Sequence, residues 1–341
     1  MKRIGVLTSG GDTPGMNAAI RAVFKTGVDI DLQVMGIYHG YKGLIEGRVG
    51  YLAHADVESK MHKGGTILRT ARSEEFKTEG GIEKAISVLR AYEIEGLIVI
   101  GGDGSFKGAD ALSKRGIPVI GIPGTIDNDM GYTDFTIGFD TAVNNVMNEI
   151  YKIRDTMRAH DRVGVIEVMG RRCGDIALWA GVAGAADIIL VPERPLSWAD
   201  AANRLAANKL RGQLTSIVMI AEGAGKAEDF CEYVRKYTDV EIKATVLIIS
   251  SAAATRPRST ECLPLKWGSV RLNCLRTRRI CAERTVREAE RRKITICERT
   301  SGYAVGIREN RIISVPLAEA VSTRDCFDDK LYDLNSVMAK F

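Results

Sequence analysis

Short apolar runs alternate along the chain with stretches in which apolar residues recur every three or four positions. Runs rich in Val and Ile are typical of buried strands, and the longer amphipathic stretches are typical of helices. The predicted strands are 4–7, 34–38, 97–100, 119–122, 163–168, 188–191, 217–221 and 244–249. The predicted helices are 16–28, 82–92, 106–113, 141–157, 176–183 and 199–209. Because strands buried on both faces form parallel sheets covered by helices, this alternation predicts an α/β fold.

The strand-like runs continue past residue 150. We therefore expect two Rossmann-like αβα sandwich domains, with mainly parallel sheets and an active-site cleft between them. In open α/β sheets, ligands bind at the carboxyl ends of the strands. The loops that follow the predicted strands are thus expected to carry the chemistry.

Composition argues against several other classes of protein. The chain has 341 residues, of which 45% are hydrophobic and 27% charged, enough for one large or two medium domains. No apolar run approaches the roughly 20 residues of a membrane span, and the first residues lack the features of a signal peptide. The seven cysteines have no paired ligand spacing, which argues against disulfides and zinc. We expect a cytoplasmic protein that binds no membrane.

Two glycine-rich turns follow predicted strands. Gly10 and Gly11 precede a helix, so this turn is either a phosphate cradle or a tight connection. The second turn, "GGDGS" at 101–105, also leads into a helix. Its Asp103 suits Mg²⁺, which takes one or two carboxylates plus phosphate oxygens, and Ser105 is expected to cap the helix. Two such turns on neighbouring strands favour a nucleotide site.

Four aspartates lie in the stretch 121–141, which follows another predicted strand. Asp134 and Asp140 are expected to form a turn and a helix cap. Asp127 and Asp129 are separated by one residue, and crowded carboxylates require a metal, a cation or a proton to compensate them. In-line phosphoryl transfer needs both a group that orients the hydroxyl nucleophile and a metal partner. The pair fits that chemistry.

Arginines supply the complementary charge. Arg72, Arg162 and Arg172 lie in loops, where most arginines are simply solvated. Arg171 follows a strand end and a glycine, so its side chain is expected to face the cleft. Arginine suits bidentate phosphate contacts and charge that develops in a transition state.

Several stretches taken together resemble the bacterial ATP-dependent 6-phosphofructokinases. They are "GVLTSGGDTPGMNAAIRAV", "VIGGDGSFKGA", "GIPGTIDNDMGYTDFTIGFDTA", "IYKIRDT", "VIEVMGR" and "MIAEG". The likeness covers about residues 1–247 and resumes near Gly302. It implies transfer of the ATP γ-phosphoryl group to the 1-hydroxyl of fructose 6-phosphate, with Mg²⁺, by a homotetramer that binds no nucleic acid. A lipid or NAD kinase with the same glycine turn is the rival kinase, and "TIDND" and "VMGR" argue against it.

The resemblance also implies the roles of individual residues. ATP binding is implied for Gly11, Arg72, Ser73, Gly102, Asp103, Gly104 and Ser105, with Asp103 on the metal. Catalytic roles are implied for Asp127 as general base, for Asp129 as support of the metal, and for Thr125, Arg171 and Gly11 around the moving phosphoryl group. Contacts with the sugar phosphate are implied for Thr125, Ile126, Asp127, Arg162, Met169, Gly170, Arg171, Glu222 and Lys243, and Arg162 would reach a neighbouring subunit's substrate.

In this family, glycine at 104 and 124 goes with ATP, whereas pyrophosphate enzymes carry Asp and Lys there. An effector site for ADP, GDP or phosphoenolpyruvate is implied for Arg21, Lys25, Arg154, Ala185, Ala186, Asp187, Arg211 and Gln213. Lys25 stands where arginine is expected and lacks its fork geometry. Gln213 stands where a basic residue is usual. A weak effector response is therefore expected.

Residues 251–299 depart from the family pattern. They hold 13 basic and 5 acidic residues, a net charge of +8, whereas the whole chain carries +5. The expected His and Arg are replaced by Ile249 and Ala252. Back-translation of 249–257 with permitted codons, read two bases later, gives Leu-Gln-Arg-Gly-Gly-Asp-Pro-Thr, the missing motif. This predicts a frameshift, and the alternatives are a solvated helix and an insertion that binds nucleic acid or another anion.

The resemblance finally sets the expected domains. The ATP-binding domain comprises 1–138 plus about 251–301, the sugar-phosphate domain comprises 139–250 plus about 302–320, and 321–341 forms a C-terminal tail. The functional alternative is a catalytically impaired, nucleotide-binding regulatory subunit, because the grip on the sugar phosphate is altered at 248–301.

Overall fold

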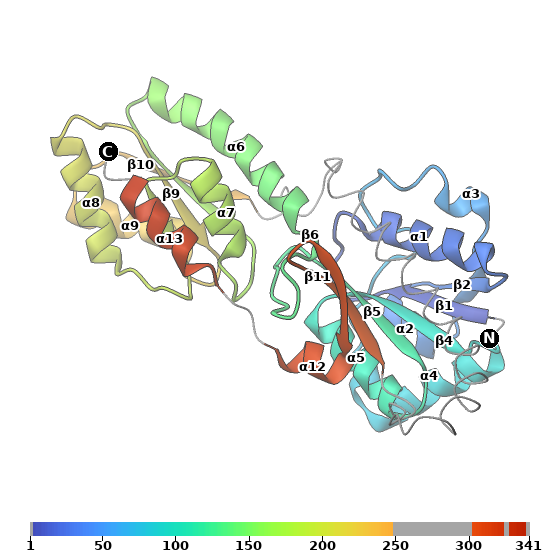
Figure 1. Cartoon of the computed structure of the whole chain (residues 1–341). Helices are drawn as coiled ribbons and strands as arrows, with labels where there is room; N and C mark the ends of the chain where they lie inside the picture. Colours follow the sequence, from blue (N-terminus) through green and yellow to red (C-terminus); the bar gives the residue numbers. More distant parts are fainter. Residues whose placement is uncertain (1–2, 248–301, 324–326, 339–341) are drawn as a thin grey trace. The chain divides into compact units, whose positions relative to one another are not determined.

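The computed structural model describes residues 3–247, 302–323 and 327–338 (Figure 1). These residues divide into two compact units. The described part of unit 1 is 3–125, 130–138 and 302–323. The described part of unit 2 is 126–129, 139–247 and 327–338. Ile249, Ala252 and the remainder of the anomalous segment lie outside the described residues.

Unit 1 is built on one large, mostly parallel sheet. Its strands follow the order β12-β11-β5-β4-β1-β2-β3, and β6 pairs with the end of β5. Their bounds are β1 Arg3–Thr8, β2 Gln33–Ile37, β3 Val49–Tyr51, β4 Gly96–Gly101, β5 Val119–Thr125, β6 Ile137–Gly138, β11 Tyr303–Arg308 and β12 Arg311–Pro316. The pairs β2–β3 and β11–β12 are antiparallel.

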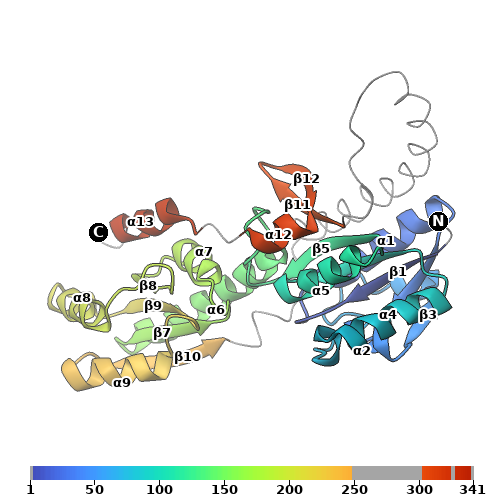
Figure 2. The same cartoon turned by 90° about the horizontal axis from the view of Figure 1, so that it is seen from below.

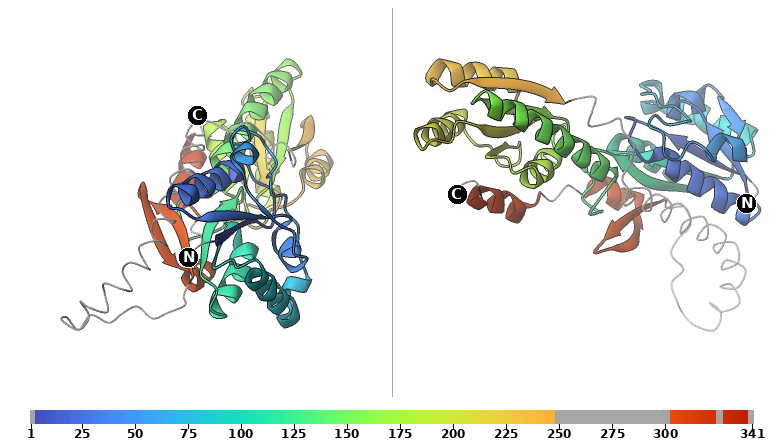
Figure 3. Two further views of the ribbon diagram at one scale, coloured as in Figure 1. Left: turned by 90° about the vertical axis from the view of Figure 1, so that its right-hand side faces the viewer. Right: turned by 90° about the horizontal axis from the view of Figure 1, so that it is seen from above.

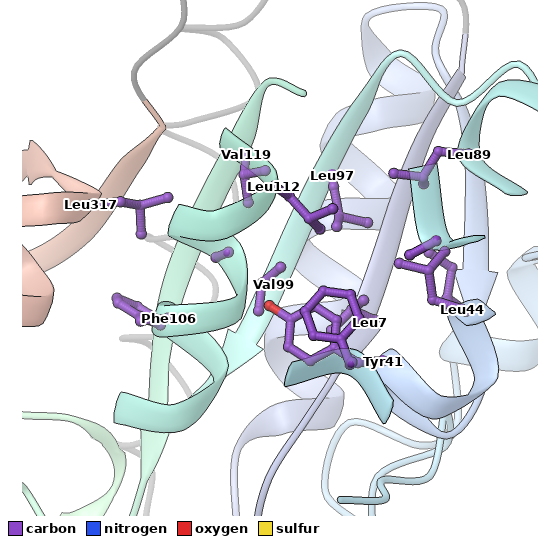
Figure 4. Packing of buried hydrophobic residues seen from close by; sticks show 14 of the residues in the cluster. Leu7, Tyr41, Leu44, Leu89, Leu97, Val99, Phe106, Leu112, Val119 and Leu317 are labelled. Atoms are coloured by element: carbon purple, nitrogen blue, oxygen red, sulfur yellow. The ribbon is translucent and has the colours of Figure 1, made fainter. Parts of the chain in front are cut away.

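Helices cover both faces of this sheet, as Figure 1 shows. Alternate residues of each central strand point to opposite faces: Val6 packs in a cluster beneath α1, and Leu7 packs against α2, α4 and α5 (Figure 4). Because both faces are buried, the strands read as unbroken apolar runs. The helices are α1 Met16–Asp29, α2 Gly40–Ile45, α3 His54–Val57, the 3₁₀ turn η1 Glu75–Lys77, α4 Glu79–Ala91, α5 Asp103–Lys114 and α12 Leu317–Ser322.

Unit 2 has a smaller parallel sheet with the order β10-β7-β9-β8. Its strands are β7 Val163–Val168, β8 Ile188–Leu190, β9 Ser216–Ala221 and β10 Ile242–Leu247. Its helices are α6 Phe139–Ala159, α7 Asp175–Ala183, α8 Trp198–Leu210, α9 Ala227–Tyr237 and α13 Asp329–Met338. Leu205 of α8 and Phe230 of α9 share one buried cluster with the strands. On α7, a Cβ at Gly181 would lie 2.7 Å from Ile189, so that helix packs on the sheet with no room to spare.

The structure confirms the predicted fold class and all eight predicted strands, as β1, β2, β4, β5, β7, β8, β9 and β10. It adds short elements that carry little periodicity, such as β3, β6 and α3. The helix predicted at 106–113 begins earlier, at Asp103, because Gly102 rather than Ser105 is its N-cap residue. No helix among the described residues is long and apolar enough to cross a membrane.

The β11–β12 hairpin differs from the expected domain division. We expected 302–320 to belong with the sugar-phosphate domain, but β11 pairs in parallel with β5, and the hairpin is the edge of the unit 1 sheet (Figures 1 and 2). Figure 3 shows the same red hairpin from two further sides. The reason is apolar burial, since Ala304 and Val305 are fully buried there. In the tail, α13 belongs to unit 2.

Candidate active site

The two glycine turns of unit 1 lie side by side. Strands β1 and β4 are neighbours, with Thr8 opposite Ile100. Directly beyond them, the Ser9 N–H donates to the Ile100 carbonyl at 3.0 Å. The Ser105 hydroxyl then donates to the Ser9 carbonyl at 2.9 Å. The carboxyl ends of two adjacent strands therefore present both turns at one edge of the sheet.

Glycine is required at two positions of this edge. A Cβ at Gly101 would lie 2.4 Å from the Ser105 hydroxyl and 2.5 Å from the Ser9 carbonyl oxygen. Gly10 has φ of 88°, a conformation that disfavours side chains. Backbone groups can approach a ligand closely here, as phosphate cradles need.

Helix α5 begins in the second turn. Ser105 does not cap it, contrary to our expectation; its buried hydroxyl links the two turns instead. Asp103 is the first helical residue, and its carboxylate is 41% exposed and 2.7 Å from the ammonium of Lys107. The helix N-terminus combines free backbone donors with a positive dipole end, so it suits phosphate.

Gly104 and Gly124, the two glycines expected to go with ATP rather than pyrophosphate, have different surroundings. A Cβ at Gly104 would meet nothing within 4 Å. A Cβ at Gly124 would lie 3.1 Å from Ile100 and 3.4 Å from Met16. The first position is open to solvent. The second is packed by the protein's own side chains.

The other residues expected around ATP lie in loops of the same unit. A Cβ at Gly11 would also meet nothing within 4 Å. The Thr70 hydroxyl donates to the Gly10 carbonyl at 2.7 Å and so ties the loop 66–74 to the first turn. Arg72 is exposed, and the Ser73 hydroxyl accepts from the Phe76 N–H at 3.2 Å.

In unit 2, Asp127 faces Arg171. Thr125 is the last residue of β5, Ile126 is buried, and Asp127 follows it in the turn. The guanidinium Nε of Arg171 lies 3.3 Å from the Asp127 carboxylate, and the two side chains are 56% and 6% exposed. A buried carboxylate therefore lies beside an exposed guanidinium. Asp129 lies partly exposed in the same turn.

The turn that carries Arg171 is held by Glu222. One carboxylate oxygen of Glu222 accepts from the Arg171 N–H at 2.6 Å and from the Gly170 N–H at 3.2 Å. Arg171 has a left-handed φ of 54°, and Gly170 has φ of 143° with no space for a Cβ beside the Cys173 carbonyl. Met169 is partly buried. We assigned Glu222 to the sugar from the sequence; here it fixes the position of Arg171.

The turn predicted for Asp134 is present, whereas Asp140 does not cap α6 as predicted, because that helix already begins at Phe139. The Asp134 carboxylate accepts from the Glu309 N–H at 2.7 Å in the turn of the β11–β12 hairpin. Asp140 lies in the first turn of α6, where its carboxylate accepts from the Asn144 amide at 3.3 Å. The Asp134 contact holds a turn, and the Asp140 contact lies within α6.

Other residues expected at the sugar phosphate lie on unit 2. Arg162, before β7, is paired with Glu241 at 2.5 Å. Lys243 is exposed on β10. This pair uses the guanidinium Nε of Arg162.

The residues expected at the effector site belong to both units. In unit 1, Glu58 bridges Arg21 at 3.3 Å and Lys25 at 3.0 Å. The Lys25 ammonium also lies 3.2 Å from a ring nitrogen of His54. Hydrogen bonding to Lys25, with a smaller contribution from Arg21, holds the pKa of Glu58 below its ordinary value. An internal anion therefore already contacts both cations.

In unit 2, Arg154 donates to the carbonyls of Gly184 and Ala185, the latter at 2.7 Å. The Asp187 carboxylate accepts from the side-chain amide of Gln213 at 2.6 Å. The side chain of Gln213 thus hydrogen-bonds to the turn 185–187, which is itself expected at the effector site. Arg211 is exposed at the end of α8.

Sequence reasoning missed Asn128 and Asp175. Asn128 lies between the two aspartates and its side-chain amide donates to the Asp175 carboxylate at 2.9 Å. The sequence does place Asp175 close to the arginine pair, because "CGDI" directly follows Arg171 and Arg172. Among the described residues, no group of three or more His, Cys, Asp or Glu side chains could hold a metal ion. A metal here would need ligand oxygens from phosphate, as Mg²⁺ commonly has.

Comparison with known proteins gives a consistent picture. The sequence model of the family described as phosphofructokinase matches residues 3–255. The chain is 46% identical over 340 residues to the ATP-dependent 6-phosphofructokinase of Clostridium botulinum strain Hall, with 100% of both chains covered. It is 45% identical over 339 residues to that of Clostridium novyi strain NT, with 99% of this chain and 100% of the relative covered.

Solved structures of phosphofructokinases have a fold similar to that of this chain. Phosphofructokinase from Saccharomyces cerevisiae matches with a TM-score of 0.85 and 31% identity, covering 98% of this chain and 50% of the yeast chain. The chain therefore spans half the length of that relative. A pyrophosphate-dependent phosphofructokinase from Marinobacter aquaeolei shares the fold, with a TM-score of 0.80 and 20% identity over 96% of this chain and 86% of that chain.

Proposed function

The chain belongs to the phosphofructokinase family, and on this premise we propose that it transfers the γ-phosphoryl group of ATP to the 1-hydroxyl of fructose 6-phosphate. The products are ADP and fructose 1,6-bisphosphate. The observation that carries the proposal is the buried Asp127 carboxylate 3.3 Å from the guanidinium of Arg171. A regulatory subunit without activity is not favoured, because both of these groups are present.

Asp127 acts as the general base. Its carboxylate accepts the proton of the sugar 1-hydroxyl as that oxygen bonds to the γ-phosphorus. The bond from the γ-phosphorus to the bridging oxygen breaks, and its electron pair stays on the β-phosphate of ADP. Such proton transfer contributes roughly 10²–10⁴-fold in rate. Arg171 and Thr125 stabilise the charge on the moving phosphoryl group, which is the dominant need in this chemistry.

ATP is the co-substrate, and its phosphates lie on the two glycine turns. Gly11, Gly102, Gly104 and the start of α5 supply backbone donors, while Arg72 and Ser73 contact the rest of the nucleotide. The open space at Gly104 supports this assignment.

Asp103 would hold Mg²⁺, and Asp129 would support it. The ion supplies neutralisation of phosphate charge when bound. The exposed Asp103 carboxylate, placed at a helix N-terminus, fits one carboxylate ligand plus phosphate oxygens. Lys107, which pairs with it, would have to turn away.

The two units divide the work. Unit 1 binds ATP and unit 2 binds the sugar phosphate through Ile126, Met169, Gly170, Glu222 and Lys243, with Arg162 serving a neighbouring subunit. The enzyme acts in the cytoplasm as a homotetramer. ADP, GDP or phosphoenolpyruvate acts as a weak effector at Arg21, Lys25, Arg154, residues 185–187, Arg211 and Gln213.

The first experiment measures ATP- and Mg²⁺-dependent formation of fructose 1,6-bisphosphate by this chain, with Asp127→Ala as the matched variant. We expect turnover that falls at least about 100-fold in the variant, since it lacks the base. Binding of ATP, measured by calorimetry, is expected to be equal in both chains. Equal turnover in both chains would contradict the role of Asp127.

The same assay tests the segment 248–301. Turnover would mean that the reaction tolerates the altered segment, which weakens the frameshift hypothesis. Absent turnover with intact ATP binding would mean that the grip on the sugar phosphate is lost, and resequencing of the gene across codons 248–301 would then decide the hypothesis.

A further inference from the structure

We propose that Asp175 is a positioning residue for the catalytic turn 127–129 and acts through the side-chain amide of Asn128. The inference rests on the proposed function, because it concerns the alignment of Asp127. It goes further in assigning a role to two residues, Asn128 and Asp175, that do not contact the reacting atoms. All of the groups belong to unit 2.

The contact is buried and short. The Asn128 amide donates to the Asp175 carboxylate at 2.9 Å. Asn128 is 7% exposed and Asp175 is 4% exposed. A hydrogen bond to a carboxylate away from water is among the stronger ones in proteins, and its loss leaves a buried donor without its acceptor. The pair therefore constrains where the turn can lie.

Asn128 needs such a constraint. Its φ of 55° is left-handed, a region that asparagine visits at a cost and that surrounding structure must enforce. Because Asn128 lies between Asp127 and Asp129, its backbone conformation sets the directions in which both carboxylates point. The bond to Asp175 fixes the side chain of this central residue.

Asp175 lies at a helix N-terminus. It is the first residue of α7, where the helix dipole favours a carboxylate. The N–H of the preceding Gly174 is taken by the Glu193 carboxylate at 2.7 Å. Arg171 lies only four residues earlier, on a turn held by Glu222. One short segment, 171–175, thus carries both the cation that faces Asp127 and the acceptor that holds its neighbour.

The test compares four chains in the turnover assay: wild type, Asp175→Ala, Asn128→Gly and the double variant. Glycine removes the amide but adopts the left-handed φ without strain. We expect each single variant to lower kcat at least tenfold, since small misplacements of a catalytic group cost this much or more. The KM for ATP is expected to stay within twofold, because the proposed ATP residues lie in unit 1.

Two further readouts separate positioning from loss of fold. Asp175→Asn retains an oxygen acceptor of similar size, so it is expected to keep most of the kcat that Asp175→Ala loses. The double variant is expected to be no slower than the slower single variant. Full addition of the two losses, wild-type kcat in Asp175→Ala, or equal losses in the Asn and Ala variants would overturn the proposal.

Thermal unfolding of the same four chains supplies a readout that does not need turnover. If the bond exists, the falls in Tm of the two single variants do not add in the double variant. Additive falls would overturn the inference. An inactive wild-type chain would bear only on the proposed function and on the segment 248–301, and the unfolding cycle would still decide whether Asp175 holds Asn128.

Discussion

At the start of α5, the absence of a side chain at residue 104 leaves open space beside the phosphate cradle. A Cβ there meets nothing within 4 Å, so the fold itself does not demand glycine at this position. Gly104 is exposed, so this space is open to solvent and available to a ligand. The contrast with Gly101, where the protein's own atoms exclude a Cβ, shows that neighbouring glycines serve different ends.

We predict that Gly104→Asp raises the KM for ATP at least tenfold and leaves Tm unchanged within about 2 °C. The carboxylate would repel phosphate, yet it suits the first turn of a helix. Steady-state kinetics and a thermal scan check this, and Gly116→Asn, at an open left-handed turn just past the other end of α5, is the control. An unchanged KM for ATP would contradict the placement of the nucleotide.

Glu58 is the other informative single residue, because it neutralises two cations that we assign to effector binding. Its lowered pKa, due first to Lys25, means that it remains charged at neutral pH and below. Each contact is exposed and weak on its own. Together they lower the positive potential that an effector anion would meet.

We predict that Glu58→Gln tightens binding of ADP about threefold, since Arg21 and Lys25 lose their internal counter-ion. Calorimetry without fructose 6-phosphate measures this. Glu93→Gln, which removes an exposed carboxylate paired with Arg3 in the same unit, is the matched control. Equal affinities for ADP in the two variants would argue against an effector site at Arg21.

At the scale of elements, Tyr41 joins α2 to the beginning of α5. Its hydroxyl donates to the Ser105 carbonyl at 2.6 Å, and its ring stacks on Phe76 with centroids 4.0 Å apart. Burial raises the pKa of Tyr41 well above its ordinary value. The contact supports the same turn that carries Asp103 and Ser105.

This pKa shift makes a prediction for alkaline stability. The folded state prefers the neutral phenol, so the stabilisation is complete below the unfolded-state pKa of about 10 and is lost as pH rises above that value toward the folded-state pKa. We predict that Tyr41→Phe costs about 1 kcal/mol of unfolding free energy at pH 8 and shows a shallower decline above pH 10.

Denaturant unfolding between pH 8 and 11 measures the free energy of unfolding and its decline with pH. Tyr51→Phe, at a side chain that is 61% exposed, is the control and is expected to follow wild type. A decline in Tyr41→Phe as steep as in wild type would mean that Tyr41 ionisation does not limit alkaline stability.

At the scale of the whole molecule, the two units each contribute part of the proposed machinery. The chain passes from Thr125 in unit 1 to Asp127 in unit 2 within two residues. The proposed base is therefore joined by a short stretch of backbone to the end of β5.

We predict that the chain sediments as a tetramer, four copies of 37.2 kDa or about 149 kDa in all. Equilibrium sedimentation at micromolar concentration gives the mass. A monomer would contradict both the tetramer and the role of Arg162 at a neighbouring subunit's substrate, and it would leave only the residues of a single chain for catalysis.

The sequence by itself determined the fold class, the eight strands and the positions of both glycine turns. Each of these follows from local periodicity or from a residue type with a strong backbone preference, and both properties can be read over a few residues. The pairing of Asp127 with a metal partner or a cation was also a prediction from residue type alone.

Only the tertiary structure decided which distant groups meet. The bond from Ser105 to Ser9 joins residues 96 apart, that from Asn128 to Asp175 joins residues 47 apart, and β11 pairs with β5 across most of the chain. Such contacts depend on how strands and helices pack, and local periodicity does not carry that information. Two expectations differ from the structure for this reason: the capping role of Ser105 and the domain of the hairpin. Asp175 went unnoticed for the same reason.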